Sequence, residues 1–225
     1  MNNVEKRKPK NEVKFAISLN EEQKIAKEQI LQKPISFLFG RAGSGKTLLA
    51  VQIALDMFFK RDAERIIITR PTVSSEDNGF IPGNIQEKLD PWLVPIRDNM
   101  RKVYPHPEKL EKMEVDKQIE LVALTHFRGR TFDNAVCIVD EFQNLTEKQL
   151  EMCIGRLGKG SIMIFCGDLD QIDLQTRFTP IFYTVDALKN SQFVNHITLL
   201  KNHRHPALIE IFELIAKNKH DGNTV

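Results

Sequence analysis

The feature that most constrains the fold of this chain is a glycine-rich octapeptide between a strand-like and a helix-like segment. Residues 35–39 form a short, mainly apolar run typical of a buried strand, and apolar residues recur at helical spacing from Thr47 to about Lys60. The octapeptide matches the pattern G-x-x-x-x-G-K-[ST] and consists of Gly40, Arg41, Ala42, Gly43, Ser44, Gly45, Lys46 and Thr47. Strand, loop and helix in this order predict a loop whose backbone N–H groups enclose an anion at a helix start.

The residue types of the octapeptide indicate that the anion is a nucleoside triphosphate. The Lys46 ammonium is predicted to reach the β- and γ-phosphates and to assist catalysis, and the Thr47 hydroxyl to take a coordination position on Mg²⁺. We expect contacts to the nucleotide along the whole segment from Gly40 to Leu48. The alternative, a glycine-rich turn that binds nothing, is disfavoured because the strand and the helix that the motif requires flank it. ATP and Mg²⁺ are therefore the predicted ligands.

A second apolar strand ends in two acidic residues. Residues 136–139 are apolar and are followed by Asp140 and Glu141, and ligands of open parallel sheets bind at the carboxyl ends of strands. Asp140 is predicted to hold Mg²⁺ through water beside Thr47, and Glu141 to polarise the attacking water. Two acids after a strand are a weak indication alone, but together with the glycine-rich loop they predict ATP hydrolysis.

A third apolar strand, residues 161–166, ends at Gly167 and is followed by Asp168 and Gln171. We interpret Gln171 as a catalytic sensor of the γ-phosphate and Asp168 as its polar neighbour. The alternative is an aspartate-rich turn that caps the next helix. The position of these residues after a strand, like that of Asp140 and Glu141, favours the sensor.

Charge that develops on the γ-phosphoryl group requires a further cation, and the leading candidate for this catalytic role is Arg204, mainly because of the resemblance described below. The competing candidates are Arg41, Arg70, Arg128 and Arg130. His203 and His205 flank Arg204, but no third metal ligand follows nearby in the sequence, so exposed loop histidines are favoured over a metal site.

The rest of the chain alternates between strand-like and helix-like segments. Strands are expected at residues 65–69, 119–124, 135–139 and 195–199, and helices at 20–31, 85–104, 146–157, 180–188 and 206–217, with a fresh helix start at Pro91. Strands that are apolar on both faces and alternate with amphipathic helices predict an α/β fold, in which helices cover both faces of a parallel sheet in three layers. A single domain is expected over residues 18–217, between a basic, disordered arm (1–17) and a frayed tail (218–225).

Composition excludes several classes of protein. Hydrophobic residues make up 41% of the chain and charged residues 28%, and no apolar run approaches the length of a membrane-spanning helix. The three cysteines are widely spaced in apolar segments, which favours buried thiols over disulfides or a zinc site. We therefore expect a cytoplasmic protein without a secretory signal or membrane partner, and the net charge of +2 does not by itself predict a polyanion partner.

Three segments resemble motifs of superfamily 1 helicases. Residues 19–23 resemble the adenine-reading glutamine motif, which would place Gln23 on the base. Residues 167–171 resemble the third helicase motif, and residues 202–204 resemble the segment whose arginine, here Arg204, contacts the γ-phosphate.

A closer resemblance, from about Gln23 to Phe212, is to the PhoH-like ATPase family. It is carried by Arg70-Pro71, by residues 79–83, 87–92, 127–132 and 140–146, and by residues 167–174. The resemblance implies a RecA-like P-loop core, ATP hydrolysis and a link to RNA. Phe142 departs from the usual alanine, and residues 175–179 lack the usual proline and Ser-Gly; these departures concern local contacts and not the phosphate chemistry.

The expected partners follow from this resemblance. Superfamily 1 motors place ATP between two RecA-like domains, and this chain has room for one, so we expect a homo-oligomer such as a ring, with Arg128, Arg130 or Arg204 supplied in trans. The expected output is remodelling of RNA or single-stranded DNA, for which Phe80 and Trp92, near Lys88 and Arg97, could stack bases; packing of both rings in the core is an alternative of at least equal weight. An ATP-responsive regulatory module with little turnover is the alternative function, whereas the absence of an arginine-rich lid disfavours a kinase.

Overall fold

The computed structural model describes residues 13–71, 85–168 and 180–221, except the side chains of residues 85–92, 180, 213 and 216–221. The helices are α1 (Glu21–Ile30), α2 (Lys46–Phe59), α3 (Ile85–Val103), α4 (Pro107–Val115), α5 (Glu147–Ile154), α6 (Pro180–Ala187) and α7 (Pro206–Asp221). The strands are β1 (Ile35–Gly40), β2 (Arg65–Thr69), β3 (Ile119–Leu121), β4 (Ala135–Asp140), β5 (Ile162–Gly167) and β6 (Val194–Leu199). Short 3₁₀ helices follow β3, β4 and α6.

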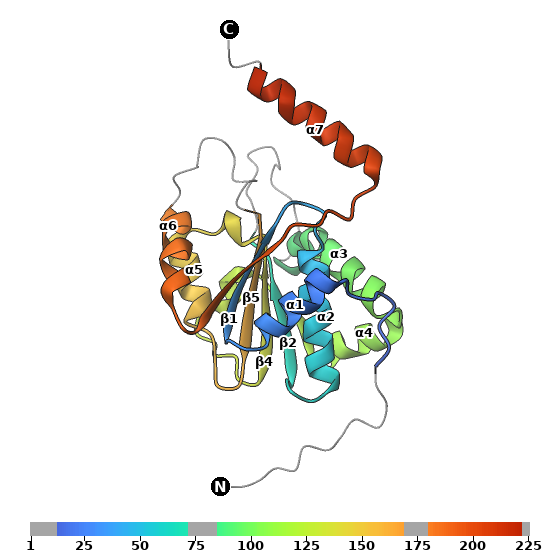
Figure 1. Ribbon diagram of the computed structural model, residues 1–225. Helices are drawn as coiled ribbons and strands as arrows, with labels where there is room; N and C mark the ends of the chain where they lie inside the picture. Colours follow the sequence, from blue (N-terminus) through green and yellow to red (C-terminus); the bar gives the residue numbers. More distant parts are fainter. Residues whose placement is uncertain (1–12, 72–84, 169–179, 222–225) are drawn as a thin grey trace.

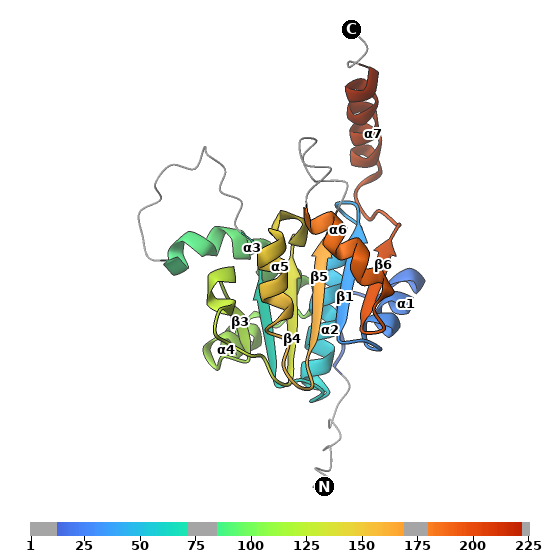
Figure 2. The ribbon, with the colours of Figure 1, turned by 90° about the vertical axis from the view of Figure 1, so that its left-hand side faces the viewer.

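The six strands form one sheet in the order β3-β2-β4-β5-β1-β6, and every pairing is parallel. Helices α1 to α4 lie on one side of the sheet and α5 and α6 on the other (Figures 1 and 2). The predicted three-layer α/β fold is confirmed. All strands point the same way, so their carboxyl ends, including those that carry the predicted site residues, meet at one edge of the sheet.

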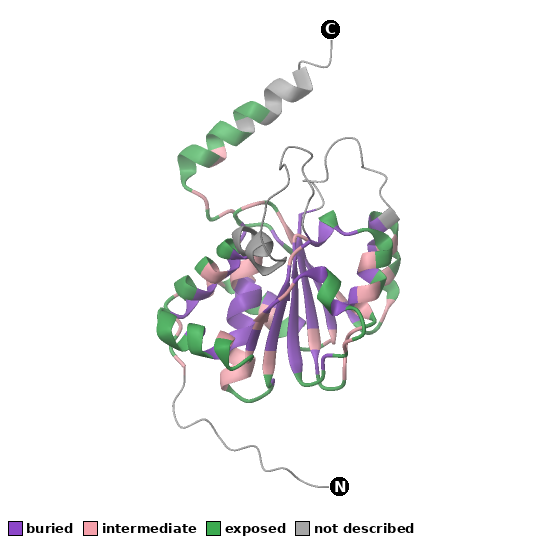
Figure 3. Cartoon of the chain, turned by 180° about the vertical axis from the view of Figure 1, so that it is seen from behind, coloured by how far each residue is buried: buried purple, intermediate pink, exposed green. Residues whose placement is uncertain are grey.

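The sequence produces this arrangement because alternate residues of each strand face opposite sides of the sheet. Leu38, Ile66 and Ile138 belong to the apolar cluster that contains α1 to α4, whereas their neighbours Phe37, Ile67 and Cys137 belong to the cluster that contains α5 and α6. All six side chains are fully buried. Figure 3 shows the buried strands between more exposed helices. A strand that is apolar on both faces must be covered on both, which requires two helical layers.

Two helix starts follow local signals in the sequence. The Asn20 side chain accepts a hydrogen bond from the backbone N–H of Gln23, whose side chain accepts one from the backbone of Asn20. Thr146 and Gln149 form the same reciprocal capping box at the start of α5. Each pair satisfies backbone donors that a helix leaves without an internal partner. The predicted starts of both helices are confirmed.

Helix α3 corrects the predicted break at Pro91, because it runs without interruption from Ile85 to Val103 through Pro91 and Pro95. A proline inside a helix removes one backbone hydrogen bond and crowds the preceding turn. The compensation is packing: Leu93, Ile96, Met100 and Val103 are buried at helical spacing in the cluster that also contains α2. Burial of four such side chains stabilises the helix by several kcal/mol in total, which is comparable with the cost of the prolines.

Three further differences concern one helix that was not predicted and two boundaries. Helix α4 was not predicted, because Leu110 and Met113 alone are buried along it and give little periodicity. In the predicted arm, Val13 and Phe15 pack against the core and the backbone N–H of Ala16 donates to Val103 O at 2.9 Å, so the end of this segment belongs to the domain. Helix α7 continues to Asp221, beyond the predicted end at Lys217. Residues 1–12 and 222–225 of the predicted arm and tail lie outside the described residues.

Two expectations from composition can be compared with the structure. Cys137, Cys153 and Cys166 are buried free thiols, and burial raises the pKa of Cys137 and of Cys153 to about 12. Over the described ranges, no helix has the length and apolar character needed to cross a bilayer.

Candidate nucleotide-binding site

The glycine-rich loop joins the end of β1 to the start of α2. Gly43 and Gly45 have φ angles of 90° and 86°, a left-handed region that favours glycine, and Gly45 is the N-cap of α2. A Cβ atom on Gly43 would lie 2.6 Å from Cγ of Arg204 and 2.9 Å from Oδ1 of Asn202. Glycine is therefore required at position 43 both by the backbone conformation and by the close approach of the segment after β6.

Two polar side chains of the loop fit an anion ligand. The Lys46 ammonium donates to the loop's own carbonyl oxygens, at 2.5 Å to Gly40 O and 3.3 Å to Arg41 O. The Ser44 hydroxyl oxygen is buried and has no hydrogen-bond partner in the described part of the chain. A buried polar atom without a partner is rare in native structures. Lys46 could exchange its bonds to these carbonyls for bonds to a phosphate, and the Ser44 hydroxyl could donate to the same group, so the loop fits the predicted triphosphate.

Thr47 and Asp140 meet across the sheet edge. The Thr47 hydroxyl donates to Oδ1 of Asp140 at 2.7 Å, although β5 lies between the strands that precede them. The Asp140 side chain is 5% exposed. Burial, reinforced by the negative charge of Glu141, raises the pKa of Asp140 to about 6, while the Thr47 hydrogen bond opposes the rise. A buried carboxylate beside a hydroxyl is a donor set of hard oxygen atoms, which fits Mg²⁺.

Glu141 leaves the strand in an unusual conformation. Its φ angle of 52° is left-handed, which costs about 1–2 kcal/mol for a residue other than glycine. Its Oε1 lies 3.5 Å from the Arg70 guanidinium, which also lies 3.9 Å from Oδ2 of Asp140. Its Oε2 accepts a hydrogen bond of 2.6 Å from the Gln143 amide. Backbone strain of this kind occurs often at functional sites, because surrounding contacts hold it in place.

Gln143 was not singled out in the sequence as a site residue. Its amide is buried and joins two strand ends: Nε2 donates to Glu141, and Oε1 accepts from the backbone N–H of Asp168 at 3.3 Å. Gln143 belongs to the segment 140–146 that carries the family resemblance, which was the available signal. The direction of its side chain depends on the left-handed turn at Glu141, which a sequence pattern does not show.

Gln23 lies against the glycine-rich loop. The residue is 6% exposed, and a Cβ atom on Gly45 would lie 2.9 Å from Nε2 of Gln23. Nearby, the Asn20 amide lies 3.1 Å from Nε2 of His203, and the backbone N–H of His203 donates to Gly43 O at 2.9 Å. The structure thus brings the predicted base-reading residue to the start of α2. His203 is exposed, as expected for a loop histidine, but it also contacts Asn20 and Gly43.

The arginine candidates lie in different surroundings. Arg204 lies beside Gly43, and its guanidinium is 5.0 Å from the centre of the Phe212 ring in α7. Arg70 lies beside both acids, as described above. Arg130 is paired with Glu120 at 2.8 Å, whereas Arg128 is exposed. The geometry therefore brings Arg204 and Arg70 to the site, and Arg130 has a partner on β3.

Some of the remaining predicted site residues lie outside the residues that the structure describes. Gln171 and Phe80 lie in undescribed segments, as does the side chain of Trp92. Asp168 is buried at the end of β5, next to Gln143. Leu48 packs against the core cluster of α2, so its side chain faces the protein interior. Within the described ranges there is no group of three or more His, Cys, Asp or Glu side chains that could hold a metal ion.

Comparisons with known proteins identify the family and the fold of the chain. The sequence profile of the family described as "PhoH-like protein" matches residues 17–216. PhoH-like proteins from Synechocystis sp. and Bacillus subtilis are 43% identical over 64% of this chain and 39% identical over 80% of it. The chain spans about half the length of these relatives, 44% of the first and 58% of the second.

The fold also resembles that of a solved structure with a distant sequence. The SWI2/SNF2 ATPase core of Sulfolobus solfataricus, in complex with dsDNA, matches with a TM-score of 0.50 at 15% identity, over 85% of this chain and 47% of that one. At this identity the likeness concerns the fold alone. The chain therefore has the RecA-like α/β fold of P-loop helicase and ATPase cores, a fold consistent with an NTPase.

Proposed function

The chain belongs to the PhoH-like protein family, and we propose from this premise that it binds Mg-ATP at the glycine-rich loop and hydrolyses it. The observation that carries the proposal is the 2.7 Å hydrogen bond between Thr47 and Asp140. It supports the proposal because it joins the phosphate loop to the acid-bearing strand at the point where a nucleotide-bound Mg²⁺ is needed.

Each residue has a defined task in this proposal. Lys46 turns from its own loop carbonyls to the β- and γ-phosphates, and the backbone N–H groups of the loop bind the phosphate oxygens. Thr47 and Asp140 would hold Mg²⁺, which would supply positive charge near the phosphate oxygens. Gln23 is the proposed contact to the adenine base, beside Gly45.

Glu141 is the proposed general base. Its carboxylate orients a water molecule and accepts its proton as the water oxygen attacks the γ-phosphorus, while the bond to the β,γ-bridging oxygen breaks and ADP leaves. Gln143 holds Oε2 of Glu141 in place, and Arg70 or Arg204 supplies positive charge near the γ-phosphoryl group. Gln171 is retained as the proposed γ-phosphate sensor from its place after β5 in the sequence.

The test is phosphate release measured beside nucleotide binding. Lys46→Ala should abolish binding or turnover. Glu141→Gln should lower turnover by about 10²- to 10⁴-fold and leave ATP affinity within a few-fold of wild type. The exposed neighbour Asn144, changed to alanine, is the matched control. A Glu141→Gln variant with normal turnover would contradict the assignment of the base.

A second candidate function is an ATP-responsive regulatory module with little turnover. It is favoured by the contacts of Glu141, because Gln143 bonds one carboxylate oxygen and Arg70 lies near the other. Partners on both oxygens leave the carboxylate fewer acceptor positions for a water molecule. A wild-type protein that binds ATP but releases no phosphate, with or without nucleic acid, would support this candidate over the ATPase.

The proposed output is remodelling of RNA or single-stranded DNA by a homo-oligomer. Helix α7 extends away from the body (Figure 1) and exposes Leu208, Ile211, Phe212 and Ile215 on one face, which supports self-association. A neighbouring subunit would supply a cation in trans. Light scattering that detects monomer alone, with and without ATP, would remove the oligomer. Turnover unchanged by single-stranded RNA, DNA and duplexes would remove the nucleic-acid coupling.

A further inference from the structure

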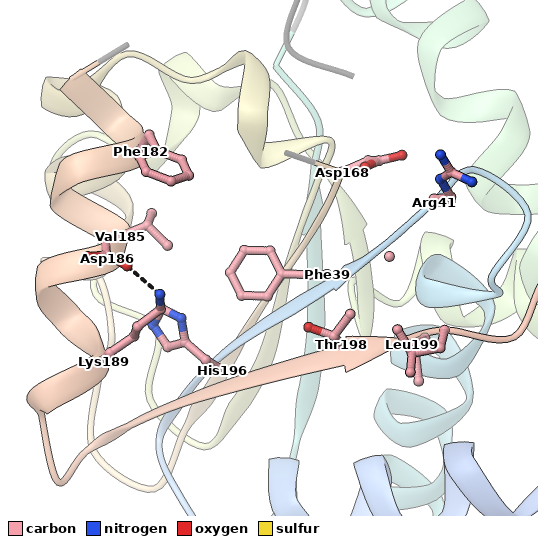
Figure 4. A pocket seen from close by; sticks show the side chains of 12 residues that line it. Phe39, Arg41, Asp168, Phe182, Val185, Asp186, Lys189, His196, Thr198 and Leu199 are labelled. Atoms are coloured by element: carbon pink, nitrogen blue, oxygen red, sulfur yellow. Dashed lines mark hydrogen bonds and ion pairs between the residues drawn. The ribbon is translucent and has the colours of Figure 1, made fainter. Parts of the chain in front are cut away.

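A pocket of about 450 Å³ lies on the side of the sheet that faces α6, next to the glycine-rich loop. Figure 4 shows it between the side chains of α6 and those at the ends of β1 and β6. Gly40 and Arg41 belong both to its lining and to the phosphate loop. Helix α2 and Gln23 belong to the opposite layer, so this pocket adjoins the proposed ATP site from the other face of the sheet.

The floor and one wall of the pocket are aromatic and apolar. Phe39 lies at its centre in Figure 4, and Phe182 and Val185 approach it from α6. The Phe39 ring is fixed from below, with its centre 6.2 Å from that of Phe37 and 5.4 Å from that of His196. Phe182 is 39% exposed, so it is held less tightly and offers an accessible ring face. Such a site suits a flat ring that is partly apolar.

The polar groups of the pocket lie at its two ends. Arg41 and Asp168 lie at the end nearest the phosphate loop (Figure 4). Arg41 is exposed and forms no ion pair with any residue that the structure describes. At the other end, Asp186 and Lys189 form an ion pair beside His196, and burial, followed by the charge of Lys189, lowers the pKa of His196. The four charged side chains sum to zero, so the interior favours a neutral ring and Arg41 favours an anion at the rim.

We propose that this pocket binds one unpaired nucleobase in contact with the rings of Phe39 and Phe182, with the attached phosphate at Arg41. A nucleoside monophosphate has this combination of a neutral heterocyclic ring and a single adjacent anion. It could be a free nucleotide or one unit of a single strand. The pocket volume is too small for a duplex or a protein helix. The inference extends the proposed nucleic-acid coupling to a defined site, and it does not require ATP hydrolysis.

The consequence for the protein is a direct path between the pocket and the phosphate loop. Arg41 follows Gly40 at the end of β1 and precedes the residues that enclose the phosphate. A phosphate at the rim would fix the side chain and the backbone of the first loop residues. Occupancy of the pocket would therefore favour one conformation of the loop, and nucleotide in the loop would change the affinity of the pocket by the same factor.

The test is binding of fluorescein-labelled hexauridylate to the whole 225-residue chain, measured by anisotropy with uridine monophosphate as competitor. Phe182→Ala should weaken binding by about 5- to 100-fold, the range found for removal of one base–aromatic stack. Phe193→Ala is the matched control, because Phe193 is 57% exposed and does not line the pocket. Thr198→Trp, at an exposed lining position, provides a second variant that fills the pocket without removing a core contact.

The two probes distinguish a free nucleotide from one unit of a single strand as the natural ligand. Competition by the free monophosphate at concentrations similar to those of the hexamer assigns the pocket to free nucleotides, whereas binding of the hexamer alone assigns it to single strands. Equal hexamer binding by wild type, Phe182→Ala and Thr198→Trp, or no binding of either probe, would overturn the proposal. The titrations are repeated with Mg²⁺ and a non-hydrolysable ATP analogue. Failure of the analogue to bind would contradict the proposed ATP site. The comparison of hexamer affinity between wild type and Phe182→Ala would still test the pocket.

Discussion

The Thr47 hydroxyl and the Asp140 carboxylate are joined by a 2.7 Å hydrogen bond that spans the intervening strand β5. The bond links the helix that begins at the phosphate loop to the strand that ends in the two acids. Because Asp140 is buried and Thr47 is its closest hydrogen-bond donor in the structure, each side chain determines the position of the other.

The first prediction concerns this bond. Thr47→Ala removes a hydrogen bond to a charged group, worth about 1.5–3 kcal/mol, and should weaken Mg²⁺-dependent binding of an ATP analogue by about 10- to 100-fold. Thr47→Ser keeps the hydroxyl and should restore most of the affinity. Isothermal titration with and without Mg²⁺ measures the effect, and Thr125→Ala, at an exposed threonine, is the control. Equal loss of affinity without Mg²⁺ would indicate a role in loop structure instead.

The second prediction concerns Gln143, which we regard as a positioning residue for Glu141. Gln143→Leu keeps the shape of the side chain but removes the bonds to Glu141 and to the Asp168 backbone. We expect kcat to fall by about 10- to 100-fold, as for the loss of one hydrogen bond to a carboxylate, with KM for ATP little changed. Steady-state kinetics provide both constants. A rise in KM at unchanged kcat would mean that Gln143 acts in binding.

The third prediction separates backbone strain from close contact in the phosphate loop. Gly43→Ala should impair ATP binding, because the new methyl group would lie 2.6 Å from Arg204 Cγ and the residue would keep a φ angle of 90°. Gly129→Ala is the control: its φ angle is 72°, and no atom lies within 4 Å of the added methyl. Both variants should lose about 1–2 kcal/mol of stability from strain. Gly43→Ala alone should lose nucleotide affinity, and equal affinity in both would contradict the close approach of Arg204.

The fourth prediction concerns the pH dependence of stability at Asp56, which joins α1 to α2. Burial acts to raise the pKa of Asp56, but the hydrogen bonds from Lys27 at 2.5 Å and Lys60 at 2.9 Å outweigh it and hold the pKa below the usual 3.8. The unfolded chain therefore binds the proton more tightly than the folded chain. The carboxylate contributes stability above pH 3.8, and this contribution is lost as the pH falls through the lower folded pKa.

Urea unfolding measures this effect. Asp56→Asn should lower the free energy of unfolding at pH 7 by about 1.5–3 kcal/mol, and the difference from wild type should shrink as the pH falls below about 4. Glu21→Gln breaks the exposed Glu21–Lys24 pair and should cost no more than about 1 kcal/mol. A difference between wild type and Asp56→Asn that is independent of pH would show that the ionised carboxylate is not the stabilising group.

The fold could be predicted from the sequence where a local pattern and the packing agree. The runs at 35–39, 65–69 and 135–139 became central strands, since segments with apolar residues on both faces have to be covered on both. The capping boxes at Asn20 and Thr146 fixed two helix starts. Local signals failed at α3, where Leu93, Ile96 and Met100 bury a face strongly enough to keep the helix intact through two prolines.

The sequence predicted which residues form the candidate site, but it did not predict several of the side-chain contacts between them. The pattern from Gly40 to Thr47 and the two acids at the end of β4 predicted residues that the fold does bring together, because all the strands end at the same edge. The sequence did not show that Arg70 approaches both acids or that Gln143 joins Glu141 to the end of β5. These contacts depend on the left-handed turn at Glu141 and on the order of the strands, which are properties of the assembled sheet.

The position of β5 between β1 and β4 has a consequence for how the site tolerates change. Asp140 is in register with Cys166, and Cys166 with Leu38, so two backbone ladders, each about 4.8 Å wide, separate the loop strand from the acid strand. Main-chain hydrogen bonds, and not side chains, set that width. Exchanging one apolar residue of β5 for another therefore leaves the gap unaltered, whereas lengthening or shortening β5 by a single residue would misalign both of its neighbours at once.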